Sequence, residues 1–319
     1  MILNIFLLVV GFVILIKGAD VFVDGASSLA RNFKLPTILI GLTIVAFGTS
    51  APELAVSIQS ILKGSGDIVL GNVIGSNILN ILLIVGVSTM FHSLTVKNNT
   101  VKKELPITLL LSTLFIVLLN DSVFGLGENN LSRQDGIILL LFFTVFLYYL
   151  LTIMKNNKET DKNEEEEIKY SIPKSIIFIV LGMVGIIFGS DFVVDGASNI
   201  ASALGISEKM IALTIVALGT SLPELVTSVT ATRKGEYDIA IGNVVGSNIF
   251  NICTVIGLPV TFVGGINHIN FNLVDLAVLF TAVFMLFIFS LKDRKIEKKE
   301  GFVLLSLFLV YYTYVVIGQ

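Results

Sequence analysis

The sequence predicts an all-α polytopic membrane protein of ten transmembrane helices, arranged as two inverted five-helix repeats. Three observations predict this class: an apolar composition, ten apolar runs of membrane-spanning length, and three motifs that each occur twice at one offset. Of the 319 residues, 54% are hydrophobic and 14% are charged, and the mean hydropathy is +0.91. A soluble protein cannot bury so much apolar surface, so a lipid bilayer must be part of the solvent.

The apolar runs have the length that a bilayer requires. A hydrocarbon core about 30 Å thick is crossed by about 20 helical residues. Runs of about this length, some containing Gly, Pro or a carboxylate, are residues 2–23, 36–62, 67–91, 105–123, 134–154, 173–203, 207–232, 238–263, 271–291 and 300–317. The first run lacks the positively charged flank of a signal peptide, so we expect it to be the first membrane helix.

The connections between these runs alternate in their content of Lys and Arg. With Lys174 and Lys209, at the edges of their runs, counted with the adjoining connections, those after the first, third, fifth, seventh and ninth runs hold 17 basic residues, and the other four hold 3. By the positive-inside rule, the odd-numbered connections are cytoplasmic and both termini lie outside the cell membrane. The polar segment "KNNKETDKNEEEEIKY" lacks EF-hand spacing and is expected to be a solvated cytoplasmic linker. The chain then divides into a first repeat (1–154), the linker (155–172) and a second repeat (173–319).

Three motifs recur at a constant distance of 171 residues. "GADVFVDGASSLA" (18–30) matches "GSDFVVDGASNIA" (189–201). "GLTIVAFGTSAPE" (41–53) and "ALTIVALGTSLPE" (212–224) agree at 10 of 13 positions, and "GNVIGSNILN" (71–80) and "GNVVGSNIFN" (242–251) at 8 of 10. An odd number of helices in each repeat makes the second repeat enter from the opposite side, so the copies are expected to be inverted.

Each copy places one glutamate inside an apolar run, Glu53 and Glu224. A charge near the bilayer centre costs at least about 2.5–3.5 kcal/mol on insertion scales, so such residues usually serve function. Lys17 is the one basic residue well inside an apolar run, since Lys174 and Lys209 stand at the edges of theirs, and it cannot neutralise two symmetric glutamates. A bound cation therefore fits better than a buried ion pair.

Two hydroxyls and a helix-breaking proline accompany each glutamate. Thr49 and Ser50 precede Glu53 by four and three residues, so on a helix the three side chains share one face. The proline lacks an N–H, so we expect a break that frees backbone carbonyls near Ala46 and Phe47 as further oxygen ligands. The equivalent positions in the second copy are Ala217, Thr220, Ser221 and Glu224.

The third motif supplies a polar face on each of two further helices. Its polar residues recur at i, i+4 and i+8, and its glycines are expected to let backbones approach closely. One interpretation is a packing face with interhelical hydrogen bonds; the other is a second set of cation ligands beside the glutamates. The polar positions are Asn72, Ser76 and Asn80, with Asn243, Ser247 and Asn251, and the glycines are Gly71, Gly75, Gly242 and Gly246.

The candidate ligands are all oxygen atoms. Ca²⁺ takes six to eight oxygens, Na⁺ has nearly the same radius, and Mg²⁺ prefers a small octahedron that keeps its waters. Two glutamates are neutralised by one Ca²⁺ or by two Na⁺, whereas an empty, doubly negative site is costly to carry through lipid. The residues therefore favour exchange of Na⁺ for Ca²⁺ as transported ions, with no cofactor and no nucleic-acid or obligatory protein partner.

Other site chemistries are poorly supported by the sequence. Cys253 is the single cysteine, so an intramolecular disulfide and a cysteine metal cluster are excluded. His92 and His268 fall near connections between helices, so we expect neither a histidine metal site nor a Ser–His hydrolase in the membrane.

With G-T-S-x-P-E and G-N-x-x-G-S-N present twice at one offset, the whole chain resembles the sodium/calcium exchanger family of calcium/cation antiporters. The resemblance implies a secondary active transporter, not an enzyme, that moves Ca²⁺ against Na⁺ by alternating access. It also implies that runs 2–23 and 173–203, with glycine-dotted apolar faces, slide across the other helices. The family's ion ligands carry over to Ala46, Thr49, Ser50, Glu53, Ser76, Asn80, Ala217, Thr220, Ser221, Glu224, Ser247 and Asn251.

One position departs from some members of that family. Asn251 stands where potassium-dependent members carry Asp, which argues against K⁺ co-transport and leaves two carboxylates in the site. A second repeated feature has two interpretations. Asp20 and Asp24, with Asp191 and Asp195, could form an ion vestibule, or they could be interfacial or interhelical hydrogen-bonding residues, and we favour the latter.

Two other transport functions remain open from the residues. A Ca²⁺/H⁺ exchanger could use the same glutamates as proton carriers, although the Thr–Ser pairs offer neutral oxygens that suit Na⁺. A passive cation channel is less favoured, because inverted repeats with broken helices are typical of alternating access.

Overall fold

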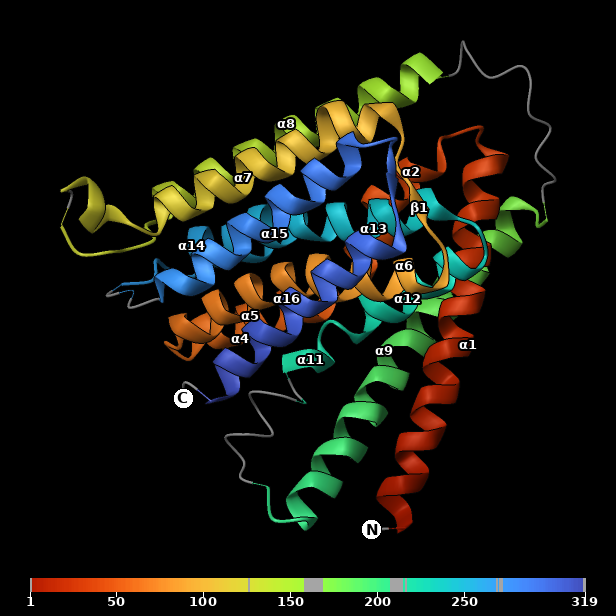
Figure 1. Ribbon diagram of the computed structural model, residues 1–319, viewed down its shortest axis with the longest axis horizontal. Helices are drawn as coiled ribbons and strands as arrows, with labels where there is room; N and C mark the ends of the chain where they lie inside the picture. The colour runs from red at the N-terminus through yellow and green to blue at the C-terminus, as the bar shows by residue number, and fades with distance from the viewer. Residues whose placement is uncertain are drawn as a thin grey trace.

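The chain is almost entirely helical (Figure 1). The structure, a computed structural model, describes residues 2–125, 127–157, 169–206, 215, 217–267, 269 and 272–317. Two strands, β1 (Leu94–Thr95) and β2 (Lys295–Ile296), pair antiparallel in one two-stranded sheet. The prediction of a helical fold is confirmed. The described residues add this short sheet, which joins two connections far apart in the sequence, and an isolated antiparallel bridge between Leu131 and Ile266.

Seven helices in the described residues are long and apolar enough to cross a membrane, or eight if a bent helix pair counts as one span. The chain is thus a polytopic membrane protein, and the count of ten helices stays a prediction. Continuous helices are α1 (Ile2–Asn32), α8 (Arg133–Asn157), α9 (Ile172–Ala203), α15 (Leu273–Leu291) and α16 (Lys298–Ile317). A shorter helix is η3 (Thr100–Glu104) continuing into α7 (Leu105–Leu118), followed by the 3₁₀ turn η4 (Asp121–Phe124).

Two of the predicted boundaries were wrong. The first helix continues to Asn32 instead of ending near residue 23, because the charged residues of its last turns find partners on neighbouring elements. The helix expected to end at 123 ends at Leu118, where a 3₁₀ turn and the left-handed Gly125 (φ 71°) reverse the chain.

The predicted break in the second run is confirmed. Helices α2 (Thr37–Ile40), η1 (Gly41–Val45) and α3 (Ala46–Thr49) run together, and α4 (Ala51–Leu62) leaves them at 45°. The bend falls immediately before Pro52, which cannot donate a backbone hydrogen bond to the preceding turn. In the second half, α11 (Ala217–Gly219) and α12 (Leu222–Arg233) repeat the break, while residues 207–214 and 216 lie outside the described residues.

Two spans contain a π-helical segment at the same position of the repeated motif. Helix α5 (Gly66–Leu79) passes through η2 (Asn80–Val85) into α6 (Gly86–Phe91). Helix α13 (Tyr237–Phe250) passes through η6 (Asn251–Ile256) into α14 (Gly257–Phe262). Asn80 and Asn251 thus each begin a π-helical turn, a local geometry that is frequent at functional sites.

Helices α1 and α9 form an antiparallel pair at one edge of the molecule (Figure 1). Glycines recur every seven residues on both helices, and each helix presents them to the other. A Cβ atom at Gly18 would lie 2.8 Å from the backbone nitrogen of Ile186, and one at Gly189 would lie 2.5 Å from that of Leu15. The glycines at this interval are Gly11, Gly18 and Gly25 of α1 and Gly182, Gly189 and Gly196 of α9, and Gly185 of α9 also faces Gly18.

This packing corrects the role that the sequence predicted for those glycines. They were expected to form faces on which each helix slides across the rest of the molecule. The structure places them between α1 and α9, where backbone meets backbone and the two helices interlock. The pair meets the remaining described helices through its contacts with α2, α11 and α12.

Helix α13 lies at the centre of the fold. Every residue from Ile239 to Phe250 is buried, and the helix packs against α2, η1, α3, α12 and η6. Helix α5 is the equivalent element of the first half and contacts α4 and η6. The two helices that carry the third repeated motif therefore flank the two breaks.

Candidate functional site

Glu53 and Glu224 lie in the first turns of α4 and α12, immediately after the two breaks. Both residues are buried, with 0% and 1% of their surface exposed. Lys17 is exposed and pairs with Asp20, so it does not reach either glutamate. Within the described part of the chain, neither glutamate has a basic partner.

Hydroxyls from each half of the chain contact the glutamate of the other half. Ser50 donates from Oγ to Oε1 of Glu224 at 2.9 Å. The Thr49 hydroxyl donates to Oδ1 of Asn243 at 3.0 Å and lies close to the same carboxylate. In the equivalent arrangement, the Thr220 hydroxyl interacts with the Glu53 carboxylate. The two broken helices therefore share one polar cluster, as the symmetric motif predicted.

Serines of the third motif join this cluster. Ser76 donates to Oε1 of Glu53 at 3.4 Å, and Ser221 donates to the hydroxyl of Ser76 at 3.3 Å. Ser247, the equivalent of Ser76, is fully buried on α13, and its hydroxyl has no hydrogen-bond partner among the described residues.

The two terminal asparagines of the motif hydrogen bond across the interface between α5 and α13. Asn80 donates from Nδ2 to Oδ1 of Asn248 at 3.1 Å, and Asn251 donates from Nδ2 to Oδ1 of Asn77 at 3.1 Å. With their amino groups engaged, Asn80 and Asn251 keep their carbonyl oxygens for other contacts. Asn77 and Asn248 belong to the repeated motif, but they follow Ser76 and Ser247 by one residue and so fell outside the predicted face.

Asn72 and Asn243 have a different role from the other asparagines. Asn72 donates to the backbone oxygen of Glu53 at 3.0 Å and to Ser57 at 3.1 Å. Asn243 donates to the backbone oxygen of Glu224 at 3.4 Å and to Ser228 at 2.9 Å. For these two residues the interhelical hydrogen-bond interpretation holds, and the repetition of serine at positions 57 and 228 was the signal for it.

The expected release of the Ala46 carbonyl was wrong. The Ala46 oxygen accepts the Ser50 amide at 3.0 Å. Pro52 removes the amide that would reach the carbonyl four residues earlier, which is that of Gly48. In the second half the carbonyl of Gly219, four residues before Pro223, accepts the hydroxyl of Ser190 on α9 at 3.0 Å.

The interior of the cluster is lined by oxygens that lack hydrogen bonds. A buried polar atom without a partner is costly, so a group of them needs a physical reason. Their chemistry, carboxylate, amide carbonyl and hydroxyl, is that preferred by hard cations. Atoms without a partner in the described part of the chain are Glu53 Oε2, Glu224 Oε2, Asn80 Oδ1, Asn251 Oδ1 and Ser247 Oγ.

Other metal-binding side chains are not gathered in the described residues. They contain no group of three or more His, Cys, Asp and Glu residues. Cys253 is fully buried and free, and His92 follows the end of α6. His268 lies outside the described residues.

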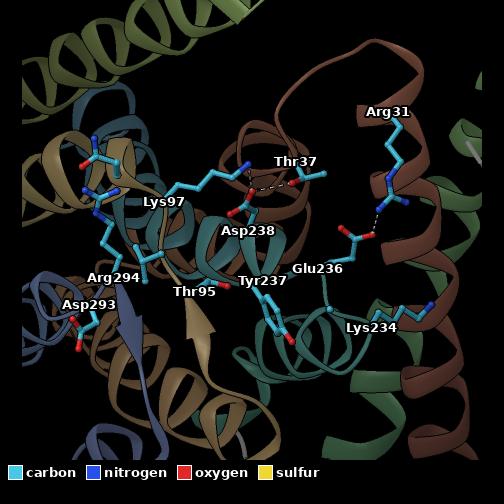
Figure 2. Close-up of a pocket in the computed structure, with 13 residues that line it drawn as sticks. Arg31, Thr37, Thr95, Lys97, Lys234, Glu236, Tyr237, Asp238, Asp293 and Arg294 are labelled. Carbon is cyan, nitrogen blue, oxygen red and sulfur yellow. Dashed lines mark hydrogen bonds and ion pairs between the residues drawn. The ribbon is translucent and has the colours of Figure 1, made fainter. Parts of the chain in front are cut away.

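A second polar region closes the molecule at the odd-numbered connections (Figure 2). Lys234 pairs with Asp24 of α1 at 2.7 Å and donates to the backbone oxygen of Asp20 at 2.7 Å. Lys169 pairs with Asp24 at 2.8 Å, and this hydrogen bond raises the pKa of the Lys169 ammonium. The aspartates of α1 thus pair with basic residues of two connections, which agrees with the interfacial hydrogen-bonding role favoured from the sequence.

A cavity of about 610 Å³ lies beside these pairs. Arg31 reaches Glu236 at 2.7 Å across it, and Lys97 reaches Asp238 at 2.7 Å (Figure 2). None of the twelve candidate ion ligands lines this cavity. The cavity is therefore a surface feature on the side of the odd-numbered connections. It is separate from the oxygen cluster, which is the group of polar residues around Glu53 and Glu224.

On the opposite side, the described residues do not form the equivalent ion pairs. The residues that correspond to Lys234, Asp20 and Asp24 are Lys63, Asp191 and Asp195. In the described residues Lys63 forms no ion pair, and neither aspartate pairs with a basic residue. Helix α1 packs against α12, whereas the equivalent packing of α9 against α4 is at most slight.

Comparison with known proteins places this geometry in a family. The family model described as "Sodium/calcium exchanger protein" matches residues 3–152 and 174–317. CaxA of Alkalimonas amylolytica is 39% identical over 316 residues, covering 97% of each chain. The sodium/calcium exchanger MaX1 of Methanosarcina acetivorans is 33% identical, again over 97% of each chain. A solved structure of the sodium-calcium exchanger NCX_Mj, soaked with Na⁺ and Ca²⁺, superposes with a TM-score of 0.81 at 33% identity over 97% of each chain. These matches span both halves of the chain, which belongs to the sodium/calcium exchanger family and is a transporter, not an enzyme.

Proposed function

We propose that this protein exchanges Na⁺ for Ca²⁺ across a membrane by alternating access at the oxygen cluster. The observation that carries the proposal is the pair of buried carboxylates, Glu53 and Glu224, with no basic partner in the described residues and with one unpartnered oxygen each. The proposed ligands are Ala46, Thr49, Ser50, Glu53, Ser76 and Asn80, with Ala217, Thr220, Ser221, Glu224, Ser247 and Asn251. The Ala46 carbonyl accepts the Ser50 amide at 3.0 Å and the Thr49 hydroxyl at 3.4 Å. Because the Thr49 hydroxyl has a nearer acceptor in Asn243 Oδ1, at 3.0 Å, a cation can take its place at the Ala46 oxygen.

Charge explains why such a site exchanges ions. One Ca²⁺ or two Na⁺ neutralise the two carboxylates, so either load makes the site cheaper to enclose than the empty site. A load of three Na⁺, as in the resemblance to the family, leaves about one net positive charge. Transport then responds to the membrane potential, by about 2.3 kcal/mol per charge per 100 mV. We expect no cofactor and no obligatory protein partner for this reaction.

The unequal closure of the two sides supports alternating access. The Lys234 ion pairs and the packing of α1 against α12 close the side of the odd-numbered connections, whereas Lys63, on the other side, forms no ion pair with the described residues. In a second state with the roles reversed, Lys63 would pair with Asp191 and Asp195. The two states then differ by an exchange of equivalent contacts, which is how an inverted repeat opens each side in turn.

We also propose the arrangement of ten helices as two inverted repeats, 1–154 and 173–319, joined by the linker 155–172. Equivalent residues of the two halves make equivalent contacts, as Asn72 with Ser57 and Asn243 with Ser228 do. The corresponding helices α1 and α9 run in opposite directions, which is the relation that inversion requires. The excess of Lys and Arg in the odd-numbered connections supports a cell-membrane protein with a cytoplasmic linker and external termini.

Calcium uptake into proteoliposomes tests the coupling ion. Vesicles loaded with Na⁺ are diluted into Na⁺-free buffer at equal pH, and uptake of Ca²⁺ is recorded. We expect uptake that disappears when Na⁺ is equal across the membrane and persists when the proton gradient is collapsed. Uptake driven by an inside-acid pH without Na⁺ would favour a Ca²⁺/H⁺ exchanger. Uptake that does not depend on an opposing gradient of any other ion would favour a passive cation channel.

A further inference from the structure

We propose that Asn77 and Asn248 are positioning residues that orient the ligand amides of the opposite half, Asn251 and Asn80. Each pair joins α5 to α13 through one amide hydrogen bond of 3.1 Å. All four side chains are at most 1% exposed, so water does not compete for these bonds. The inference rests on the proposed cation site and adds two residues that do not themselves bind the ion.

Orientation matters because a carboxamide has two chemically opposite ends. Its oxygen attracts a cation, whereas its amino group is a hydrogen-bond donor and repels one. The amino groups of Asn80 and Asn251 are engaged, and their oxygens are unpartnered in the described residues. Rotating either amide by 180° would place an amino group where the cation needs an oxygen.

The orientation of Asn77 is itself determined by the backbone. Its Nδ2 donates to the backbone oxygen of Asn248 at 3.4 Å. Because a backbone carbonyl can only accept, Asn77 must direct its amino group there and its Oδ1 toward Asn251. Asn251 can satisfy that oxygen only by donating, which turns its own oxygen away from Asn77. The sequence of contacts thus runs from the backbone through Asn77 to the ligand oxygen.

This arrangement also connects the two halves. The residue that orients Asn251 belongs to the first half, and the residue that orients Asn80 belongs to the second. Both ligand asparagines begin π-helical turns, where the regular backbone hydrogen bonding shifts. The Asn77–Asn251 pair therefore holds one ligand at a position where the helix alone defines it less well. The Asn248–Asn80 pair makes the same amide bond, but the Nδ2 of Asn248 has no partner in the described residues.

Direct Ca²⁺ binding to the purified full-length protein tests the proposal. Asn77→Leu removes the acceptor for Asn251, whereas Asn77→Asp keeps an acceptor and removes the donor to Asn248. We expect Asn77→Leu to weaken Ca²⁺ binding at least tenfold, and Asn77→Asp to stay within about threefold of the parent. A purely structural role of the Asn77 donor would make both variants lose affinity alike, and that result would overturn the proposal.

A double-mutant cycle separates orientation from packing. In an Asn251→Ala background there is no amide to orient, so adding Asn77→Leu should change Ca²⁺ affinity less than twofold. An equal loss in both backgrounds would refute the positioning role. The cycle of Asn248→Leu with Asn80→Ala applies the same test in the other half if Asn77→Leu fails to fold. Absence of Ca²⁺ binding by the parent would contradict the proposed function itself, whereas parent-like binding by Asn77→Leu would contradict only this inference.

Discussion

At the residue scale, the account depends on two carboxylates that the fold buries without neutralising them. The hydroxyls around Glu53 and Glu224 donate hydrogen bonds to them but bring no positive charge. Removing a charged group from water costs several kcal/mol, even after local relaxation. Retaining two such groups within one cluster is physically reasonable where a cation occupies the space between them.

The first prediction concerns these carboxylates. Glu53→Gln or Glu224→Gln should abolish Ca²⁺ uptake, because the amide keeps the shape but removes the charge that compensates the divalent ion. Uptake into Na⁺-loaded proteoliposomes measures the effect.

A matched control is Glu104→Gln. Glu104 is also a buried glutamate, but it accepts a hydrogen bond from Tyr149 and lies outside the oxygen cluster. The Glu104→Gln variant should retain most of the Ca²⁺ uptake, since the amide oxygen still accepts the hydrogen bond from Tyr149. Near-normal uptake by either site variant would refute the site assignment.

The sequence predicted the charged and hydroxyl residues of the cluster but could not sort its amides. A spacing of i, i+4 and i+8 defines a face, and Asn72, Ser76 and Asn80 do share one. Whether each amide binds the cation or hydrogen bonds to a neighbouring helix depends on residues of other elements, such as Ser57 for Asn72 and Asn248 for Asn80. Those distances are set by tertiary packing, so spacing alone could not reveal them.

At the element scale, the pair of α1 and α9 behaves as one body. Glycines at a seven-residue interval bring the two backbones into contact, so any added side-chain atom must separate the helices. The sequence showed these glycines, but it could not show that each helix uses them against the other. Which helix packs against a glycine face is determined by tertiary packing.

The second prediction tests this interface. Gly18→Ala or Gly189→Ala should lower the free energy of unfolding by about 1–3 kcal/mol, the usual cost of overpacking a close contact. Thermal unfolding of the detergent-solubilised protein measures it.

The control, Val13→Leu, adds a methylene group on the exposed face of α1, where the side chain is 56% exposed. It should leave the transition temperature unchanged. A parent-like transition temperature for both glycine variants would contradict the backbone contact.

The third prediction concerns the ion pairs that close one side. Lys234→Met should disfavour the state in which the odd-numbered connections are closed, and Lys63→Met should disfavour the reverse state. Partly exposed ion pairs contribute up to about 1 kcal/mol, so the population should shift by about two- to five-fold. Ca²⁺ affinity measured separately from each side of oriented vesicles should therefore change in opposite directions for the two variants. Shifts in the same direction would contradict the exchange of equivalent contacts.

At the scale of the whole molecule, composition and motif repetition predicted the membrane class, the helical fold and the family. The described helices provide seven or eight candidate spans instead of ten. Part of the difference is physical, since the second run is bent and α7 is short. Hydropathy registers these segments as apolar runs, but it cannot show that they break or end early.

The fourth prediction concerns orientation. Cys253 is the single cysteine and is fully buried, so cysteines can be introduced without removing it. Asn99→Cys lies in an odd-numbered connection and Val123→Cys in an even-numbered one. A membrane-impermeant maleimide applied to intact cells should label Val123→Cys and leave Asn99→Cys unlabelled until the membrane is opened. The reverse pattern would invert the proposed topology.

The central claim is that one oxygen cluster accepts either Ca²⁺ or Na⁺, and competition between the two ions tests it most directly. Binding of radioactive Ca²⁺ to the purified protein is measured while Na⁺ is raised at constant ionic strength, with K⁺ as the replacing ion. We predict that Na⁺ displaces Ca²⁺ competitively, that K⁺ does not, and that the double variant Glu53→Gln, Glu224→Gln binds no Ca²⁺. Ca²⁺ binding that is unaffected by Na⁺, or that survives in the double variant, would contradict the account.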